Sequence, residues 1–232
     1  MKFETGIRDI IPRTHNVKSF RFDRPSSLNY RPGQFMFVAI RQDQKEMTKH
    51  FTVSSSPTER GYIEFTKKLT GHEFSNVLDS LGIGDWARID APYGRFTFEG
   101  EYPKVAMLTG GIGITPMRSM CRYCTDLQLD TDIVLICGNR TERDIVFRED
   151  FEHMQNLNAH LRVVLTLEEP PQDWAGLSGR IGADTIIREV PDYEERVFYI
   201  CGPPAMVEAM NNLLANLGLP RERIKREDFA GY

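Results

Sequence analysis

The stretch that decides the fold is Lys104-Val-Ala-Met-Leu-Thr-Gly-Gly-Ile-Gly-Ile-Thr-Pro116. Its apolar run predicts a buried strand, and the glycines that follow let the chain turn tightly and approach a bulky anion. Pro116 is tolerated in the first turn of a helix, so we expect a helix to begin here with an N-terminus that attracts phosphate. The match to the dinucleotide-binding fingerprint is partial, because Pro116 stands where a third glycine is usual.

A second stretch, Val197-Phe-Tyr-Ile-Cys-Gly-Pro-Pro204, has the same strand-to-turn design. Apolar strands are expected to begin near residues 104, 132, 161 and 197, with helices over 117–127, 145–157 and 205–217 between and after them. Gaps of about thirty residues are the size of a strand–helix–strand unit. Residues 101–232 are therefore predicted to form an α/β domain with an open parallel sheet that binds a nucleotide.

The N-terminal part of the chain has a different pattern, in which short alternating or apolar runs are broken by turn residues. Several short strands at this spacing are typical of a small antiparallel β-barrel. We predict such a barrel for residues 1–100, with one amphipathic helix over 73–81 and a junction near 100–103. The expected strands cover residues 17–22, 35–40, 50–53, 62–67 and 86–90.

Composition excludes several classes of protein. The 232 residues carry a net charge of −4 with both signs interspersed, which does not fit a nucleic-acid-binding surface. No apolar run is long enough to span a membrane and the N-terminus lacks a signal-peptide core, so we expect a cytoplasmic protein. Cys121 and Cys124 fall in a predicted helix with no second pair, and we interpret them as buried helix cysteines rather than metal ligands. No metal site is predicted.

Five motifs, in order along nearly the whole chain, resemble those of the ferredoxin–NADP reductase family of flavoproteins. The resemblance implies an FAD-binding barrel followed by an NAD(P)-binding domain. The motifs are Lys49-His-Phe-Thr52 followed by Val-Ser-Ser, Thr70-Gly-His-Glu-Phe-Ser75, Ala91-Pro-Tyr-Gly-Arg-Phe96, Gly110-Gly-Ile-Gly-Ile-Thr-Pro116 and Cys201-Gly-Pro-Pro204.

On the flavin side, the chemistry asks for an aromatic surface beside the ring and a hydroxyl near its N5 atom. Phe51 and Thr52 can supply them, although residues 51–53 can also be ordinary strand residues. Lys49 replaces the arginine that grips the flavin phosphate in the family, so we expect a looser grip. The loop from Gly71 to Ser75 offers helix-start amides to a pyrophosphate, which favours FAD over FMN; the alternative is that Ser75 only caps the helix.

On the nucleotide side, the resemblance places Cys201 next to the nicotinamide, and a buried apolar role for it is compatible with that. Arg140 and Arg180 are expected near the adenosine ribose, with surface ion pairs as the alternative. Leu167-Glu168 stands where NADPH-specific relatives carry Ser-Arg, and a carboxylate there repels a 2′-phosphate, which favours NADH. Tyr232 is interpreted as a lid over the flavin or as a frayed tail.

The implied function is that of an FAD-dependent NAD(P)H oxidoreductase. Hydride passes from nicotinamide to flavin N5, and electrons then leave to a separate acceptor such as a ferredoxin, a flavodoxin or an oxygenase component. The alternatives are a reductase of free flavin or ferric chelates, and a non-catalytic flavin-binding electron-transfer subunit. The predicted catalytic residues are Thr52, Cys201 and Tyr232. The predicted cofactor-binding residues are Lys49, His50, Phe51, Thr52, Val53, Thr66, Lys67, Gly71, Phe74, Ser75, Thr109, Gly110, Gly111, Gly113, Ile114, Thr115, Pro116, Asn139, Arg140, Arg180, Cys201, Gly202, Pro203 and Phe229.

Overall fold

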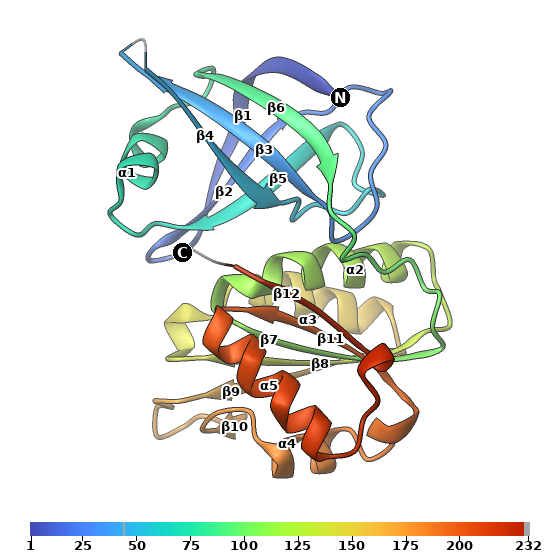
Figure 1. The fold of residues 1–232 in the computed structure, drawn as a ribbon. Helices are drawn as coiled ribbons and strands as arrows, with labels where there is room; N and C mark the ends of the chain where they lie inside the picture. Colours follow the sequence, from blue (N-terminus) through green and yellow to red (C-terminus); the bar gives the residue numbers. More distant parts are fainter. Residues whose placement is uncertain (44, 230–232) are drawn as a thin grey trace.

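The computed structural model describes residues 1–43 and 45–229, which form two sheets that follow one another along the chain (Figure 1). Within these residues the first sheet has six antiparallel strands in the order β4-β3-β6-β1-β2-β5. A bridge between Val53 and Phe65 connects the two edge strands, so the sheet closes on itself as the predicted barrel. The strands are β1 (Lys2–Thr14), β2 (Val17–Asp23), β3 (Phe35–Gln42), β4 (Lys45–Thr52), β5 (Tyr62–Lys68) and β6 (Trp86–Tyr93).

Aromatic rings fill the barrel. Phe65 stacks against Phe20 and Phe22 at ring-centroid distances of 5.2 and 5.9 Å. Helix α1 (Glu73–Ser80) covers one end of this core with the apolar face that the sequence predicts. Strand β1 was not predicted, because charged residues and Pro12 interrupt its alternation. It nevertheless pairs with both β2 and β6.

The second sheet is parallel, with the order β10-β9-β8-β7-β11-β12 within the described residues. Helices α2 and α3 pack on one face and α4 and α5 on the other, so this half is the predicted open α/β sheet (Figure 1). The strands are β7 (Lys104–Gly110), β8 (Asp132–Asn139), β9 (Leu161–Leu167), β10 (Leu177–Ser178), β11 (Val197–Gly202) and β12 (Ile224–Asp228). The helices are α2 (Ile114–Asp126), α3 (Arg148–Leu157), α4 (Ala183–Glu189) and α5 (Pro204–Asn216), with short 3₁₀ turns at Gly111–Gly113, Glu142–Asp144, Tyr193–Glu195 and Arg221–Arg223.

Several element boundaries differ from the prediction. Helix α3 begins at Arg148 rather than at residue 145, because Phe147 has a left-handed backbone with φ of 62° and its side chain is buried with those of Ile145 and Val146. Helix α4 and strand β10 were missed, since both are too short to show a clear period. Cys121 and Cys124 are buried, unpaired residues of α2, as interpreted from the sequence. Among the described residues, no helix combines the length and the apolar character needed to cross a membrane.

Candidate active site

The carboxyl ends of the parallel strands form one edge of the second sheet, the usual place for a ligand in this kind of fold. Three residues at this edge lie side by side, since Thr109 of β7 pairs with Cys201 of β11 and Cys201 pairs with Glu227 of β12. Asn139 ends β8 at the same edge. The topology thus brings together residues as distant in the sequence as Thr109 and Glu227, which are 118 positions apart. The family resemblance implied this proximity, but the local sequence pattern did not show it.

Polar atoms at this edge lack partners. Among the described residues, four buried side-chain polar atoms make no hydrogen bond, and three of them are Thr109 Oγ1, Asn139 Oδ1 and Glu227 Oε2. The fourth, Arg122 Nε, is 2.8 Å from Asp126 Oδ1 in an ion pair. Buried polar groups are nearly always satisfied in native proteins, so a polar ligand is the natural partner of the other three.

The glycines of the loop after β7 serve different purposes. Gly111 has a φ of +53° and faces open space, so it supplies both the turn and the room for an anion. Gly113 instead lies against β11, where a Cβ atom would be 2.5 Å from the Cys201 carbonyl oxygen. Gly110 lies against Met206, and the assignment of all three glycines to nucleotide binding stays a prediction.

The buried Cys201 and the half-buried Glu227 are neighbours at the end of the sheet. Burial, followed by the charges of Glu227 and Asp228, raises the pKa of the Cys201 thiol well above its usual range. Burial and the neighbouring Asp228 raise the pKa of Glu227 to about 7. A cavity of about 590 Å³ opens beside Glu227, lined by Pro204, Val207, Glu208, Arg226, Glu227 and Asp228. Glu227 therefore titrates near neutral pH beside a space large enough for a ligand.

In the barrel, Thr52 ends β4 on the side of the second sheet (Figure 1). It is directly across from Phe35 in the register, and His50 is across from Phe37, so the four side chains share one face of the sheet. Tyr93 stacks on Phe35 at 5.8 Å and meets Phe37 edge-on at 5.1 Å. Phe37 and Tyr93 are 36% and 40% exposed. We call Phe35, Phe37, His50 and Tyr93 the aromatic face.

The aromatic face was not predicted, although the alternation Phe35-Met-Phe37 was a signal for it. It leads from solvent to the buried hydroxyl of Thr52. Phe51 lies on the opposite side of β4 and is buried, with its ring 4.5 Å from Phe65 and 5.6 Å from Phe74. The rings of Phe51 and Phe74 are thus part of the barrel core. A flavin could contact only the small part of each ring that is exposed.

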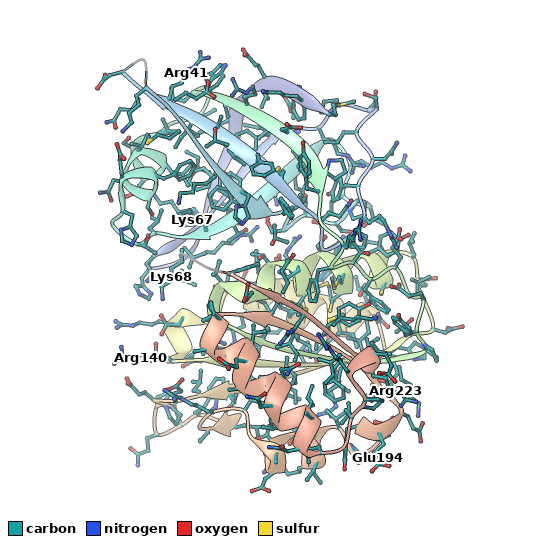
Figure 2. All side chains as sticks on the ribbon, viewed as in Figure 1. Arg41, Lys67, Lys68, Arg140, Glu194 and Arg223 are labelled. Atoms are coloured by element: carbon teal, nitrogen blue, oxygen red, sulfur yellow. The ribbon has the colours of Figure 1, made fainter. Side chains whose placement is uncertain are left out.

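Two lysines of the barrel half interact through their charges, Lys49 of β4 and Lys67 of β5. The Lys67 side chain, labelled in Figure 2, is only 6% exposed, and burial together with the charge of Lys49 lowers its pKa to about 8. Two cations held this close are stabilised by an anionic group between or beside them. Lys67 is thus a second, more buried cation beside Lys49, the predicted phosphate ligand.

Other predicted flavin residues lie differently. Gly71 has a φ of +76° and faces open space at the loop before α1. Ser75 is not the helix cap: His72 has that position, and the buried Ser75 hydroxyl accepts a hydrogen bond of 3.0 Å from the Thr70 amide. Thr66 hydrogen-bonds to Ser19 and Ser54 inside the barrel, and Val53 is fully buried. The side chains of Val53 and Thr66 are therefore core groups, and their assignment to the flavin site stays a prediction.

The two predicted ribose-side arginines are both paired. Arg180 Nη2 is 3.1 Å from Glu168 Oε2, and Arg140 Nε is 2.9 Å from Glu169 Oε1. Figure 2 shows Arg140 on the same side of the molecule as Lys67. The structure contains the surface ion pairs, and the place of both arginines near the adenosine ribose stays a prediction. Leu167, which the family resemblance places at the NADPH-selective position, is fully buried.

The remaining predicted residues surround the start of α2 and the end of β11. Phe229 continues β12, where its amide donates to the Gly202 carbonyl at 3.0 Å. Tyr232 lies outside the described residues. Ile114, Thr115 and Pro116 form the buried first turn of α2, and Gly202 and Pro203 lead from β11 into α5.

Comparison with known proteins agrees with this geometry. The oxidoreductase FAD-binding domain family matches residues 7–98, and the oxidoreductase NAD-binding domain family matches residues 107–212. A glycine betaine monooxygenase reductase subunit of Chromohalobacter salexigens is 32% identical over 95% of this chain, and human NADH-cytochrome b5 reductase 1 is 32% identical over 89% of it. A solved structure described as a ferredoxin reductase in carbazole 1,9a-dioxygenase superposes with a TM-score of 0.84, at 26% identity over 99% of this chain and 70% of that one.

The chain belongs to the ferredoxin–NADP reductase family of FAD- and NAD-binding flavoprotein oxidoreductases. It spans 79% of the human relative but only 62% of the glycine betaine monooxygenase reductase subunit. The residues present fit both cofactors. The loop at Gly71 with Lys49 and Lys67 can hold the diphosphate of FAD, and the edge with Thr109, Gly111 and Asn139 can hold a nicotinamide dinucleotide.

Proposed function

We propose that the chain is an FAD-containing reductase that oxidises NADH and delivers electrons to a protein acceptor. One observation carries the proposal: unsatisfied buried polar atoms gather at the edge of the second sheet, beside a glycine turn that faces open space. Family membership supplies the cofactor classes. When bound, the flavin accepts two electrons as a hydride and releases them in single steps.

The chain's own residues have distinct roles in this proposal. Thr52 offers a hydroxyl at the end of β4, where it can hydrogen-bond the reacting edge of the flavin. Lys49 and Lys67 hold the diphosphate. Across the boundary, Thr109 and Gly111 hold the nucleotide, while the buried Cys201 excludes water from the nicotinamide.

A protein acceptor is favoured over a small chelate by the aromatic face. Exposed aromatic side chains of this kind mark surfaces that other proteins cover. The face begins at Thr52, so a partner bound there is close to the flavin edge that Thr52 contacts. The relatives include a monooxygenase reductase subunit and a cytochrome b5 reductase. This similarity supports an oxygenase component or a small electron carrier such as a ferredoxin as the acceptor.

Anaerobic rapid mixing of the purified protein with NADH and with NADPH tests the proposal. Bleaching of the visible flavin band within seconds, faster with NADH, is the expected result. An absence of bleaching with both nucleotides would leave the non-catalytic electron-transfer subunit as the better description. Steady-state assays with a ferredoxin and with ferric EDTA then separate a protein reductase from a chelate reductase.

The four unpaired cysteines support a reducing compartment, and the cytoplasm is the location proposed for this protein. The change from antiparallel to parallel strands between β6 and β7 supports a domain boundary near residue 100, as predicted. Limited proteolysis that cuts first near residues 99–103 would agree with that boundary.

A further inference from the structure

Arg118 is a buried cation at the boundary between the two sheets. It lies in the second turn of α2 and is 4% exposed. Its guanidinium donates to Asp150 Oδ2 at 2.6 Å and to both carboxylate oxygens of Glu59 at 2.8 and 3.1 Å. Asp150 belongs to α3 of its own half, whereas Glu59 belongs to the barrel half. Arg118 thus connects the two halves by charge-assisted hydrogen bonds, which are the stronger kind.

The same guanidinium reaches the segment that follows Thr52. Arg118 Nη1 donates to the Ser54 carbonyl at 2.9 Å, and the adjacent Ser119 hydroxyl donates to the Ser55 carbonyl at 2.7 Å. Ser54 and Ser55 are both fully buried. Two consecutive residues of α2 therefore hold two consecutive carbonyls, and those carbonyls are two and three residues beyond Thr52.

The start of the same helix is held at the other side of the site. Gly113, directly before α2, lies so close to the Cys201 carbonyl that no side chain fits between them. The N-terminal end of α2 therefore lies against β11, the strand that carries Cys201. The second turn of α2 contacts the segment that follows Thr52. Figure 1 shows α2 at the boundary of the barrel and the second sheet.

We propose that Arg118 is a positioning residue that sets the spacing and angle between Thr52 on the flavin side and Cys201 on the nucleotide side. The inference rests on the proposed function, since it assigns Arg118 to the approach of the nicotinamide to the flavin. Hydride transfer is sensitive to displacements of about 1 Å, which change rates by roughly a hundredfold. A planar guanidinium with five donors fixes an orientation that a lysine ammonium does not.

The charges in this cluster keep the contact intact over a wide pH range. Burial opposes ionisation of Glu59, but the hydrogen bonds and charge of Arg118 outweigh it and lower the pKa of Glu59 to about 2. Arg13 extends the cluster by contacting Glu64 at 3.2 Å and Asp150 at 3.8 Å. Because deletion of one partner leaves buried charges unpaired, stability falls in any such variant and a matched control is required.

Arg196 provides that control. Arg196 is also 4% exposed and lies at the amino end of the same sheet. It donates to the carboxylates of Asp132 and Asp192 and, at 3.0 Å, to the Val105 carbonyl. The variants Arg118→Lys, Arg118→Met, Arg196→Lys and Arg196→Met are compared in the FAD-loaded protein. The measurements are the single-turnover rate of flavin reduction, the dissociation constant for NAD⁺, and amide hydrogen exchange of residues 52–56.

The inference requires that both Arg118 variants slow flavin reduction by roughly tenfold to a hundredfold, with the NAD⁺ dissociation constant within about twofold of wild type. Exchange at residues 52–56 should rise in the Arg118 variants and stay unchanged in the Arg196 variants. Equal rates for the Arg118 and Arg196 series overturn the inference. If the flavin of wild type is not reduced by either nucleotide, the proposed function fails. In that case the inference is judged by amide hydrogen exchange alone, and unchanged exchange of residues 52–56 in Arg118→Met overturns it.

Discussion

Arg180 and Glu168 form an ion pair at the rim of the nucleotide-binding edge, with Arg180 Nη2 3.1 Å from Glu168 Oε2. Arg180 is 83% exposed, so water screens the attraction and little stability depends on it. The pair matters for selectivity instead. We expect Glu168 both to neutralise the Arg180 charge that would attract a 2′-phosphate and to add a negative charge that repels the phosphate.

Wild type should therefore prefer NADH, and Glu168→Gln should move the ratio of kcat/KM values toward NADPH by about five- to thirtyfold, or ~1–2 kcal/mol. The substitution removes one negative charge and releases Arg180. An arginine at position 167 would not serve, because Leu167 is fully buried. Steady-state kinetics with both nucleotides give the ratio. Glu46→Gln, which breaks a barrel ion pair with Arg88, is the control and should not change it. A wild type that prefers NADPH would contradict the argument and point to Arg140 and Arg180 as phosphate ligands.

Thr52→Ala should leave FAD bound and slow its reduction by about five- to thirtyfold, or ~1–2 kcal/mol, the value of one hydrogen bond. The reason is that the hydroxyl acts at the reacting edge of the flavin, where the transition state benefits more than the bound ground state. Stopped-flow reduction by NADH measures the effect. Thr48→Ala on the exposed part of the same strand should keep the wild-type rate. Equal rates for the two variants would make Thr52 an ordinary strand residue.

Lys67→Met should weaken FAD binding by roughly ten- to hundredfold, or ~1.5–3 kcal/mol, as expected for a charge-assisted hydrogen bond to phosphate. Affinity in wild type should also fall as the pH rises through about 8, where the free protein loses the Lys67 proton. Equilibrium titration of the flavin-free protein tests both statements. The exposed neighbour Lys68 supplies the control, since Lys68→Met should bind FAD like wild type. Release of FMN instead of FAD on denaturation would refute the assignment of the Gly71 loop.

Glu227 should make stability depend on pH. Its pKa is about 7 in the folded protein against 4.5 in the unfolded chain, so between these values the folded state binds more protons than the unfolded state. Stability contributed by this residue is then present below about pH 4.5 and is lost as the pH rises to 7. We compare the free energy of unfolding of Glu227→Gln with that of wild type at two pH values. The difference, variant minus wild type, should be larger at pH 8 than at pH 5 by on the order of 1–3 kcal/mol. Urea unfolding of the flavin-free proteins measures it, and an equal difference at both pH values would contradict the prediction.

The sequence by itself determined the elements whose signals are local. The apolar run and glycines of residues 104–116 predicted a strand, a turn and a helix start, and all three are present as β7, the turn at Gly111–Gly113 and α2. The spacing of strands predicted the parallel sheet, and the turn pattern of residues 1–100 predicted the barrel. Backbone sterics and side-chain period act over a few residues, so a short stretch contains the information.

Only the tertiary structure decided which side chains meet. Arg118 and Glu59 are 59 residues apart, and nothing in the pattern around either residue indicated that they pair across the boundary of the two sheets. The same is true of the ion pair between Arg180 and Glu168, the burial of Leu167 and the use of the Thr66 hydroxyl inside the barrel. Charge, burial and hydrogen bonding depend on neighbours brought together by folding, whereas the propensity of a strand or turn depends on its own residues.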